Sequence, residues 1–353
     1  FAPAGVVDGG LNGASNTLLL QNVADVLNPG TGSAGSGYIS PATYKNFPNL
    51  KVYSGSWTIQ GSLLGAYVNP TAELNGGVTS INDALVFGTA TVVANGGTLR
   101  SQGSPLNLAN TFNLGTKGLT IDGTSQLTLS GQLGGSGALT KNGAGTLVLD
   151  NATNNYSGGT TLNGGTLTLG SATALGTGGL SVIGMSTLQT TTALSLGTGI
   201  DLGATLGVDA ANNLTLRGNI TGSGGLAKTG SGALTLTGAN NFTGGINLNA
   251  GTLIVASDTA LGTGGLTVSA TGVTLDNTTA VSLSNSIALG NSRRLALVGS
   301  NAMTLSGAIS GDFSGLDKYG AADLTLSGAN TFTGGEKLNA GKLIIGGDSA
   351  LGT

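Results

Sequence analysis

Residues 139–182 read LTKNGAGTLVLDNATNNYSGGTTLNGGTLTLGSATALGTGGLSV, and residues 226–268 repeat that order as LAKTGSGALTLTGANNFTGGINLNAGTLIVASDTALGTGGLTV. A third copy begins at residue 316 and reads LDKYGAADLTLSGANTFTGGEKLNAGKLIIGGDSALGT. Its lysine, Lys318, follows Lys228 by 90 residues, and Lys228 follows Lys141 by 87. The sequence therefore contains a long repeat of about 88 residues, so repeat architectures are considered before ordinary domains.

Each long repeat contains a shorter one, which is marked by Leu-Thr-Leu triplets and their close variants. The triplets that begin at Leu127, Leu147 and Leu167 follow one another at steps of 20 residues. Alternation over so few residues, bounded by Gly and Asn, predicts short strands whose two leucines share one face. The step is too short for a βαβ unit, and no segment shows helical periodicity. We therefore expect an all-β protein, a parallel β-helix or β-solenoid with coils of about 20 residues and a leucine core.

The composition is typical of such a coil and excludes several kinds of chemistry. Of 353 residues, 66 are glycine and only 8% are charged, with a formal net charge of −3. Glycine permits sharp corners, while Thr, Ser and Asn make the surface hydrophilic without adding charge. The absence of cysteine and histidine excludes disulfides, Cys/His zinc sites and histidine-based triads, and no basic surface indicates nucleic acid. We expect no cofactor and no metal.

The repeats suggest a division of the chain at residue 74. A partial copy occupies about 74–138, two further copies occupy 139–225 and 226–315, and a truncated copy occupies 316–353. Residues 1–73 diverge from this pattern and hold Trp57 and five of the six prolines. We expect this segment to cap the solenoid, because terminal coils of solenoids are atypical. The alternative is that its aromatic residues form a contact patch for a glycan or protein.

The recurring residues of the copies do not predict a catalytic, cofactor or metal site. We expect the three lysines to lie solvated at glycine corners. Asparagine recurs in the L-N-G/A-G motif and is expected to occupy left-handed turns and bond nearby backbone. The aromatic residue before each Gly-Gly pair is expected to pack over glycine corners. These positions are Lys141, Lys228, Lys318; Asn75, Asn163, Asn249, Asn339; Tyr156, Phe242 and Phe332.

The acidic residues could serve two roles, turn capping and catalysis. Asp258 directly precedes Thr-Ala-Leu-Gly and Asp348 directly precedes Ser-Ala-Leu-Gly, which favours turn capping. A β-helical polysaccharide lyase or glycoside hydrolase would need two carboxylates about 5–10 Å apart. Asp122 with Asp150 and Asp258 with Asp276 come nearest to the required coil spacing, but neither pair shares a phase within the coil. The sequence therefore favours a protein that is not an enzyme.

Three blocks in fixed order carry a family resemblance: L-x-K-x-G-x-G-x-L-x-L, N-N-Y/F-S/T-G-G and L-N-x-G-T-L. They resemble the autotransporter-associated β-strand repeat, the passenger-associated repeat of type V secretion, well over 139–353 and loosely over 74–138. The third copy departs from the pattern at Gly320–Asp323 and Glu336–Lys337. The resemblance implies a right-handed parallel β-helix that is secreted or displayed on the bacterial outer membrane. It also implies a C-terminal β-barrel translocator in the full-length protein.

The resulting functional expectation is a non-catalytic extracellular or cell-surface stalk or adhesin. It would mediate adhesion, aggregation, biofilm formation or display of a terminal domain, with host or bacterial surfaces, protein or glycan, or sister copies as partners. Two alternatives stay open: a self-assembling extracellular filament or matrix protein, favoured by low charge, and the β-helical polysaccharide-degrading enzyme.

Overall fold

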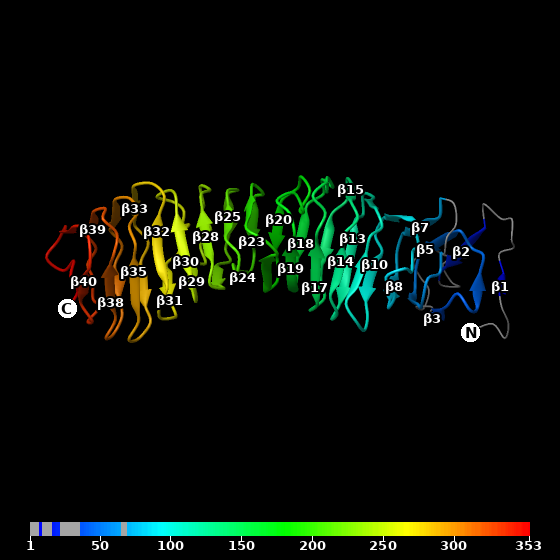
Figure 1. Ribbon diagram of the computed structural model, residues 1–353, viewed down its shortest axis with the longest axis horizontal. Helices are drawn as coiled ribbons and strands as arrows, with labels where there is room; N and C mark the ends of the chain where they lie inside the picture. Colours follow the sequence, from blue (N-terminus) through cyan, green and yellow to red (C-terminus); the bar gives the residue numbers. More distant parts are fainter. Residues whose placement is uncertain (1–6, 9–15, 22–35, 65–68) are drawn as a thin grey trace. The chain divides into compact units, whose positions relative to one another are not determined.

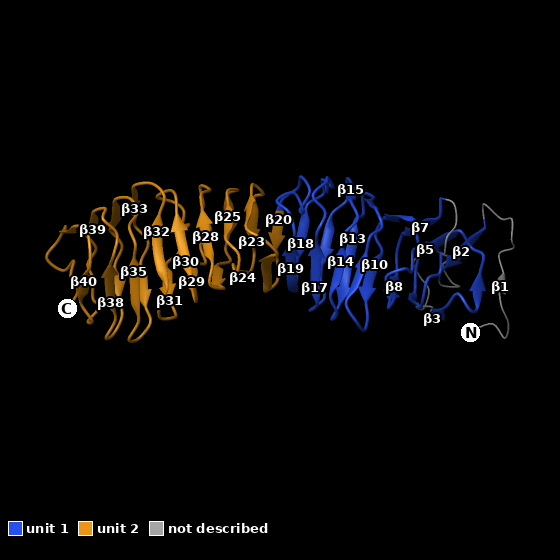
Figure 2. Ribbon diagram, in the orientation of Figure 1, with its two compact units in different colours: residues 1–179 blue, residues 180–353 orange. Residues whose placement is uncertain are grey.

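A computed structural model describes residues 7–8, 16–21, 36–64 and 69–353 (Figure 1). The described residues form short strands and no helix, and the strands pair in parallel. The chain divides into two compact units, Phe1–Gly179 and Leu180–Thr353 (Figure 2). The expected all-β parallel solenoid is confirmed, with about 15 turns in total.

The first unit stacks its coils into three parallel sheets, which we number 1 to 3, beside a small pair of strands formed by β1 (Val7–Asp8) and β4 (Tyr44–Lys45). Sheet 1 contains β2 (Thr17–Leu20), β5 (Asn49–Val52), β7 (Thr71–Leu74), β9 (Thr91–Ala94), β12 (Phe112–Leu114) and β15 (Leu133–Gly135). Sheet 2 contains β3 (Ser36–Ile39), β6 (Ser56–Ile59), β8 (Val78–Ile81), β10 (Thr98–Ser101), β13 (Leu119–Gly123), β16 (Leu139–Lys141) and β18 (Thr160–Leu162). Sheet 3 contains β11 (Leu106–Leu108), β14 (Leu127–Leu129), β17 (Thr146–Leu149) and β19 (Gly165–Leu169).

The second unit repeats this construction with strands that we group as sheets 4 to 7. Sheet 4 contains β20 (Leu180–Val182), β23 (Ile200–Leu202) and β26 (Ile220–Gly222). Sheet 5 contains β21 (Ser186–Thr190), β24 (Leu206–Asp209), β27 (Leu226–Thr229), β29 (Ile246–Leu248), β31 (Leu266–Val268), β34 (Ile287–Leu289) and β37 (Ile309–Ser310). Sheet 6 contains β22 (Leu194–Leu196), β25 (Leu214–Leu216), β28 (Ala233–Leu236), β30 (Thr252–Val255), β32 (Thr274–Asn277), β35 (Arg294–Leu297), β38 (Gly315–Lys318) and β40 (Glu336–Leu338). Sheet 7 contains β33 (Val281–Leu283), β36 (Met303–Leu305), β39 (Leu324–Leu326) and β41 (Leu343–Ile345).

The core consists of columns of apolar side chains that run from coil to coil. Leu127 pairs in register with Leu147, which pairs with Leu167, and all three are at most 1% exposed. The threonine or valine between the two leucines of each strand is less buried, as the alternation predicts. Each fully buried leucine stabilises the fold by about 1.5–3 kcal/mol before its conformational entropy is subtracted.

The long repeat is not a whole number of coils. Lys228 lies on β27 of sheet 5, and four further coils of that sheet follow through β29, β31, β34 and β37. Lys318 lies on the next strand after β37, which is β38 of sheet 6. The repeat from Lys228 to Lys318 therefore spans four coils and one additional strand, so the third copy begins on sheet 6 and the second on sheet 5.

Candidate functional site

Each copy contains a segment that forms no strand, and one sheet ends there. Sheet 1 ends at β15, sheet 4 at β26 and sheet 5 at β37. The next coil continues over each of these strands with the N-N-Y/F or N-T-F block instead of a strand, at residues 150–159, 237–245 and 327–335. Backbone contact with the preceding coil is retained at single points, such as the N–H of Asn241 donating to the carbonyl of Ile220 at 2.9 Å. The repeat motif therefore terminates a sheet.

A buried asparagine in each strand-free segment connects three successive coils. The Oδ1 of Asn240 accepts the N–H of Ile220 at 2.9 Å, and its Nδ2 donates to the carbonyl of Ala260 at 2.7 Å. Asn154 bonds Leu133 and Ala174 in the same way at 2.8 and 2.9 Å, and Asn330 bonds Ile309 and Ala350 at 2.8 and 2.6 Å. We call Asn154, Asn240 and Asn330 the clamp asparagines; all are at most 5% exposed. Their carboxamides satisfy backbone groups that no strand pairs.

The recurring aromatic residue lies two positions after each clamp asparagine. Tyr156, Phe242 and Phe332 are fully buried, which confirms that they pack inside the coil. Gly262 of the next coil lies against Phe242: a Cβ there would stand 3.0 Å from the ring and 2.4 Å from the Phe242 carbonyl oxygen. Gly262 also has a left-handed φ of 68°, so both space and backbone conformation require glycine. The predicted packing over a glycine corner is correct, and the glycine belongs to the next coil.

The first copy adds a hydroxyl pair to this arrangement. Burial raises the pKa of Tyr156 to about 12, so its hydroxyl is neutral and forms a 2.6 Å hydrogen bond with the hydroxyl of Thr160. The second copy replaces the pair with Phe242 and Ile246, which have no hydroxyl groups. The two copies thus fill the same internal position differently, the first with a hydrogen-bonded pair of hydroxyl groups and the second with two apolar side chains.

Tyr156→Phe is expected to destabilise the first unit by about 0.5–1.5 kcal/mol, because Thr160 loses its partner inside the core. The measurement is the free energy of unfolding from denaturant titration. The double variant Tyr156→Phe/Thr160→Ile recreates the second copy's pair and should recover most of the loss. A double variant no more stable than Tyr156→Phe would contradict this reading of the pair.

The prediction that the lysines are solvated is wrong. Lys141, Lys228 and Lys318 are 2%, 0% and 3% exposed. Each follows an inward leucine by two positions, so the strand alternation places it in the same apolar column. Lys228, for example, stands in register between Val208 and Leu248.

The three buried ammonium groups bind carbonyl oxygens of two successive turns, and we call these residues the clip lysines. Lys228 Nζ donates to the carbonyls of Thr229 and Gly230 in its own turn, both at 2.8 Å, and of Ala250 in the next coil at 3.1 Å. Lys141 bonds Gly143 and Gly164, and Lys318 bonds Gly320 and Ala340. Burial lowers the pKa of Lys141 to about 8, against the opposing charge of Asp122. The clip lysines therefore join successive coils through these hydrogen bonds.

Lys228→Met is expected to destabilise the second unit by about 1–3 kcal/mol, because methionine keeps the apolar stem but leaves the turn carbonyls without their donor. Hydrogen–deuterium exchange of β27 and β29, together with denaturant unfolding, would measure the change. Lys337→Met is the control, since Lys337 is exposed and its loss should cost less than about 0.5 kcal/mol. Equal stability of the two variants would refute the clip.

The L-N-G/A-G asparagines do not occupy left-handed turns. Asn75, Asn163, Asn249 and Asn339 lack a positive φ, and the glycine two residues later has it in each copy, for example 70° at Gly165. Glycine adopts this conformation without a Cβ clash, which is why it takes the corner. Part of the expectation holds, because the Asn249 amide donates to the carbonyl of Asn247 at 3.5 Å.

The carboxylates considered for catalysis lie on different elements and bind protein groups. Asp122 on β13 accepts two hydrogen bonds from Arg100, which lower its pKa, whereas Asp150 follows β17 of another sheet. Asp276 on β32 accepts from the N–H and hydroxyl of Ser300.

Asp258 does not cap its own turn. Its carboxylate accepts the N–H of Ser282 at 2.7 Å, where sheet 7 begins one coil later. Asp348 is exposed.

A shallow depression of about 350 Å³ on the described surface is lined in part by Arg100, Gln102, Asp122 and Thr124. Within the described ranges, no three acidic side chains gather as a metal site would require. The same part of the chain has no helix with the length and apolar character needed to cross a membrane.

Comparison with known proteins agrees with these repeats. The passenger-associated-transport-repeat family matches residues 139–169, 226–255 and 316–345, and each match contains one clip lysine, one clamp asparagine and one buried aromatic residue. The chain is 41% identical over 91 residues, 25% of its length, to the adhesin BmaC autotransporter of Brucella suis biovar 1 (strain 1330). It spans 3% of that protein's length. No solved structure matches the chain. Three segments of this parallel β-solenoid therefore match the passenger-associated repeat, and part of the chain is similar to an autotransporter adhesin.

Proposed function

We propose that this chain is a non-catalytic adhesive segment of a passenger. As an autotransporter passenger it is displayed at the cell surface or outside the cell. The observation that carries the proposal is the similarity to an adhesin autotransporter together with three passenger repeats whose polar residues bind the solenoid's own backbone. Clip lysines and clamp asparagines are committed to coil stacking, so the outward columns are left for contact with partners.

The outward columns indicate the kind of contact. In sheet 6, Thr215 pairs with Thr235, and Thr252 pairs with Thr274, which gives short hydroxyl rows between apolar columns. Small uncharged side chains allow close approach with little electrostatic repulsion. We propose host or bacterial surfaces, protein or glycan, as partners, with sister copies as a second target. A C-terminal translocator in the full-length protein would anchor or export the passenger.

The test is adhesion by the purified chain on beads. Beads that carry the full 353-residue chain should attach to epithelial monolayers, or to bacteria, more than beads that carry an unrelated soluble protein of similar charge. Clustering among the beads themselves would identify self-association as the mode of adhesion. Neither attachment nor clustering above the control would refute the proposal.

A further inference from the structure

The third copy places a glutamate at a position that is core in the other two copies. Glu336 on β40 pairs in register with Leu316 on β38. The equivalent residues are Thr160, 1% exposed, and Ile246, 2% exposed. An ionisable side chain therefore stands in an inward column, where the strand alternation directs it toward the coil interior.

No hydrogen-bond partner satisfies the buried oxygen of this glutamate. Glu336 Oε1 is inaccessible to solvent and accepts no hydrogen bond from another residue. In the first copy the same position holds Thr160, whose hydroxyl pairs with Tyr156. The third copy has Phe332 in place of the tyrosine, so the hydroxyl that could serve Glu336 is absent. Glu336 as a whole is only partly buried, but a buried carboxylate oxygen without a partner disfavours the ionised form.

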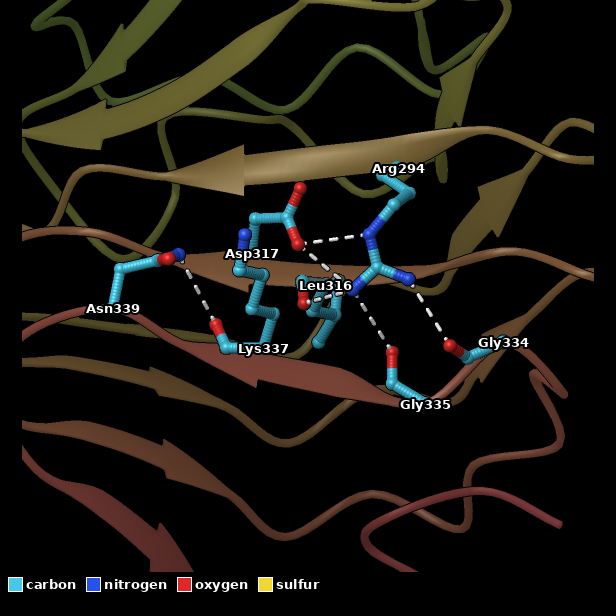
Figure 3. Close-up of polar contacts among 7 residues, drawn as sticks. All are labelled: Arg294, Leu316, Asp317, Gly334, Gly335, Lys337 and Asn339. Atoms are coloured by element: carbon cyan, nitrogen blue, oxygen red, sulfur yellow. Dashed lines mark hydrogen bonds and ion pairs between the residues drawn. The ribbon is translucent and has the colours of Figure 1, made fainter.

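The Arg294 guanidinium is bound to groups other than Glu336 (Figure 3). The Arg294 guanidinium on β35 donates to Asp317 Oδ1 at 2.8 Å and to the carbonyls of Leu316, Gly334 and Gly335 at 2.8, 3.0 and 3.3 Å. Lys318 on β38 binds the turn carbonyls already described. Lys337, next to Glu336, is exposed on the opposite side of β40. Asp317 on β38 is bonded to Arg294, and β41 contains no charged residue.

We propose that Glu336 makes the coil of β40 and β41 an acid-stabilised element, which packs when the carboxyl group is protonated and loosens when it ionises. Burial raises the pKa of Glu336, against the opposing charge of Arg294 and its own backbone N–H. A raised folded-state pKa contributes stability that is fully present below the unfolded pKa and is lost as pH rises through the folded value. Because the passenger is displayed outside the cell, this coil experiences the ambient pH.

The experiment is hydrogen–deuterium exchange of the full chain between pH 4 and 8, after correction for intrinsic exchange. The coil of β29 and β30 serves as internal reference, because it occupies the same place in the second copy and carries Ile246. The protection of β40 and β41 relative to β29 and β30 is expected to fall several-fold from pH 4 to pH 8.

Two variants separate ionisation from packing. Glu336→Gln keeps the shape and polarity but cannot titrate, and Glu336→Ile introduces the residue of the second copy. Both should give a protection ratio that does not change with pH, with the isoleucine variant the better protected. A wild-type ratio that stays constant or rises with pH would overturn the proposal, and so would the wild-type pH dependence persisting in Glu336→Gln.

Discussion

Asn240→Leu is expected to lower the stability of the second unit by about 2–5 kcal/mol, although leucine and asparagine have nearly the same shape. The substitution leaves the N–H of Ile220 and the carbonyl of Ala260 buried without partners. Each unsatisfied group costs about 1–3 kcal/mol. Hydrogen–deuterium exchange should show the loss first in β26 and in residues 256–265, which the clamp connects, and denaturant unfolding would give its size.

The adjacent residue provides the matched control. Asn241 is exposed, and only its backbone N–H contacts the preceding coil, so Asn241→Leu should change stability by less than about 0.5 kcal/mol. Two outcomes would contradict the clamp: equal effects of the two variants, or unchanged exchange of β26 in Asn240→Leu.

The leucine columns could be predicted from sequence because period-2 alternation and a constant step leave a single arrangement. Leu214, Leu234 and Leu253 recur at nearly equal spacing, and the structure stacks them in register. Burial then fixes the register, since a slip by one residue would expose every leucine of the strand. The same reasoning predicted short parallel strands, but it gave no information about a binding partner of the protein.

The burial of the clip lysines and clamp asparagines was not predicted, because lysine and asparagine usually lie at the protein surface. The signal for the lysines was present, since L-T-K, L-A-K and L-D-K continue the inward alternation. Asn154, Asn240 and Asn330 recur with the long repeat and precede the buried aromatic residue by two positions. Asparagine is abundant in this chain, so recurrence alone did not distinguish the buried positions from the turn positions. Only the backbone groups that they satisfy identify their role.

The length of the long repeat also determines where the sheets end. A repeat of 87–90 residues exceeds four coils of about 20 residues by about one strand. Each copy therefore ends a different sheet, as β26 ends sheet 4 and β37 ends sheet 5. The strand-free segments of the second unit consequently lie on two different sheets, and the interruption is distributed rather than concentrated on one side.

Phe242→Ala is expected to have the largest effect, about 3–5 kcal/mol, because it empties a fully buried aromatic site in a segment that has no strand pairing. Neighbouring backbone has little freedom to collapse into the space, since Gly262 already lies against the ring and the Phe242 carbonyl accepts the N–H of Thr263. Denaturant unfolding of the full chain, combined with exchange of β29 and residues 256–265, would measure the loss.

The same substitution at Phe313 provides the control, because that phenylalanine belongs to the same unit but is 79% exposed. Phe313→Ala should change stability by less than about 0.5 kcal/mol. If Phe242→Ala cost no more than Phe313→Ala, the aromatic residue would not support the strand-free segment. A large loss of exchange protection that is confined to residues 237–245 would show that the ring stabilises its own coil only. A loss of protection that extends into residues 256–265 would show that the aromatic residue, the clamp asparagine and the glycine together join the coils where the sheet is interrupted.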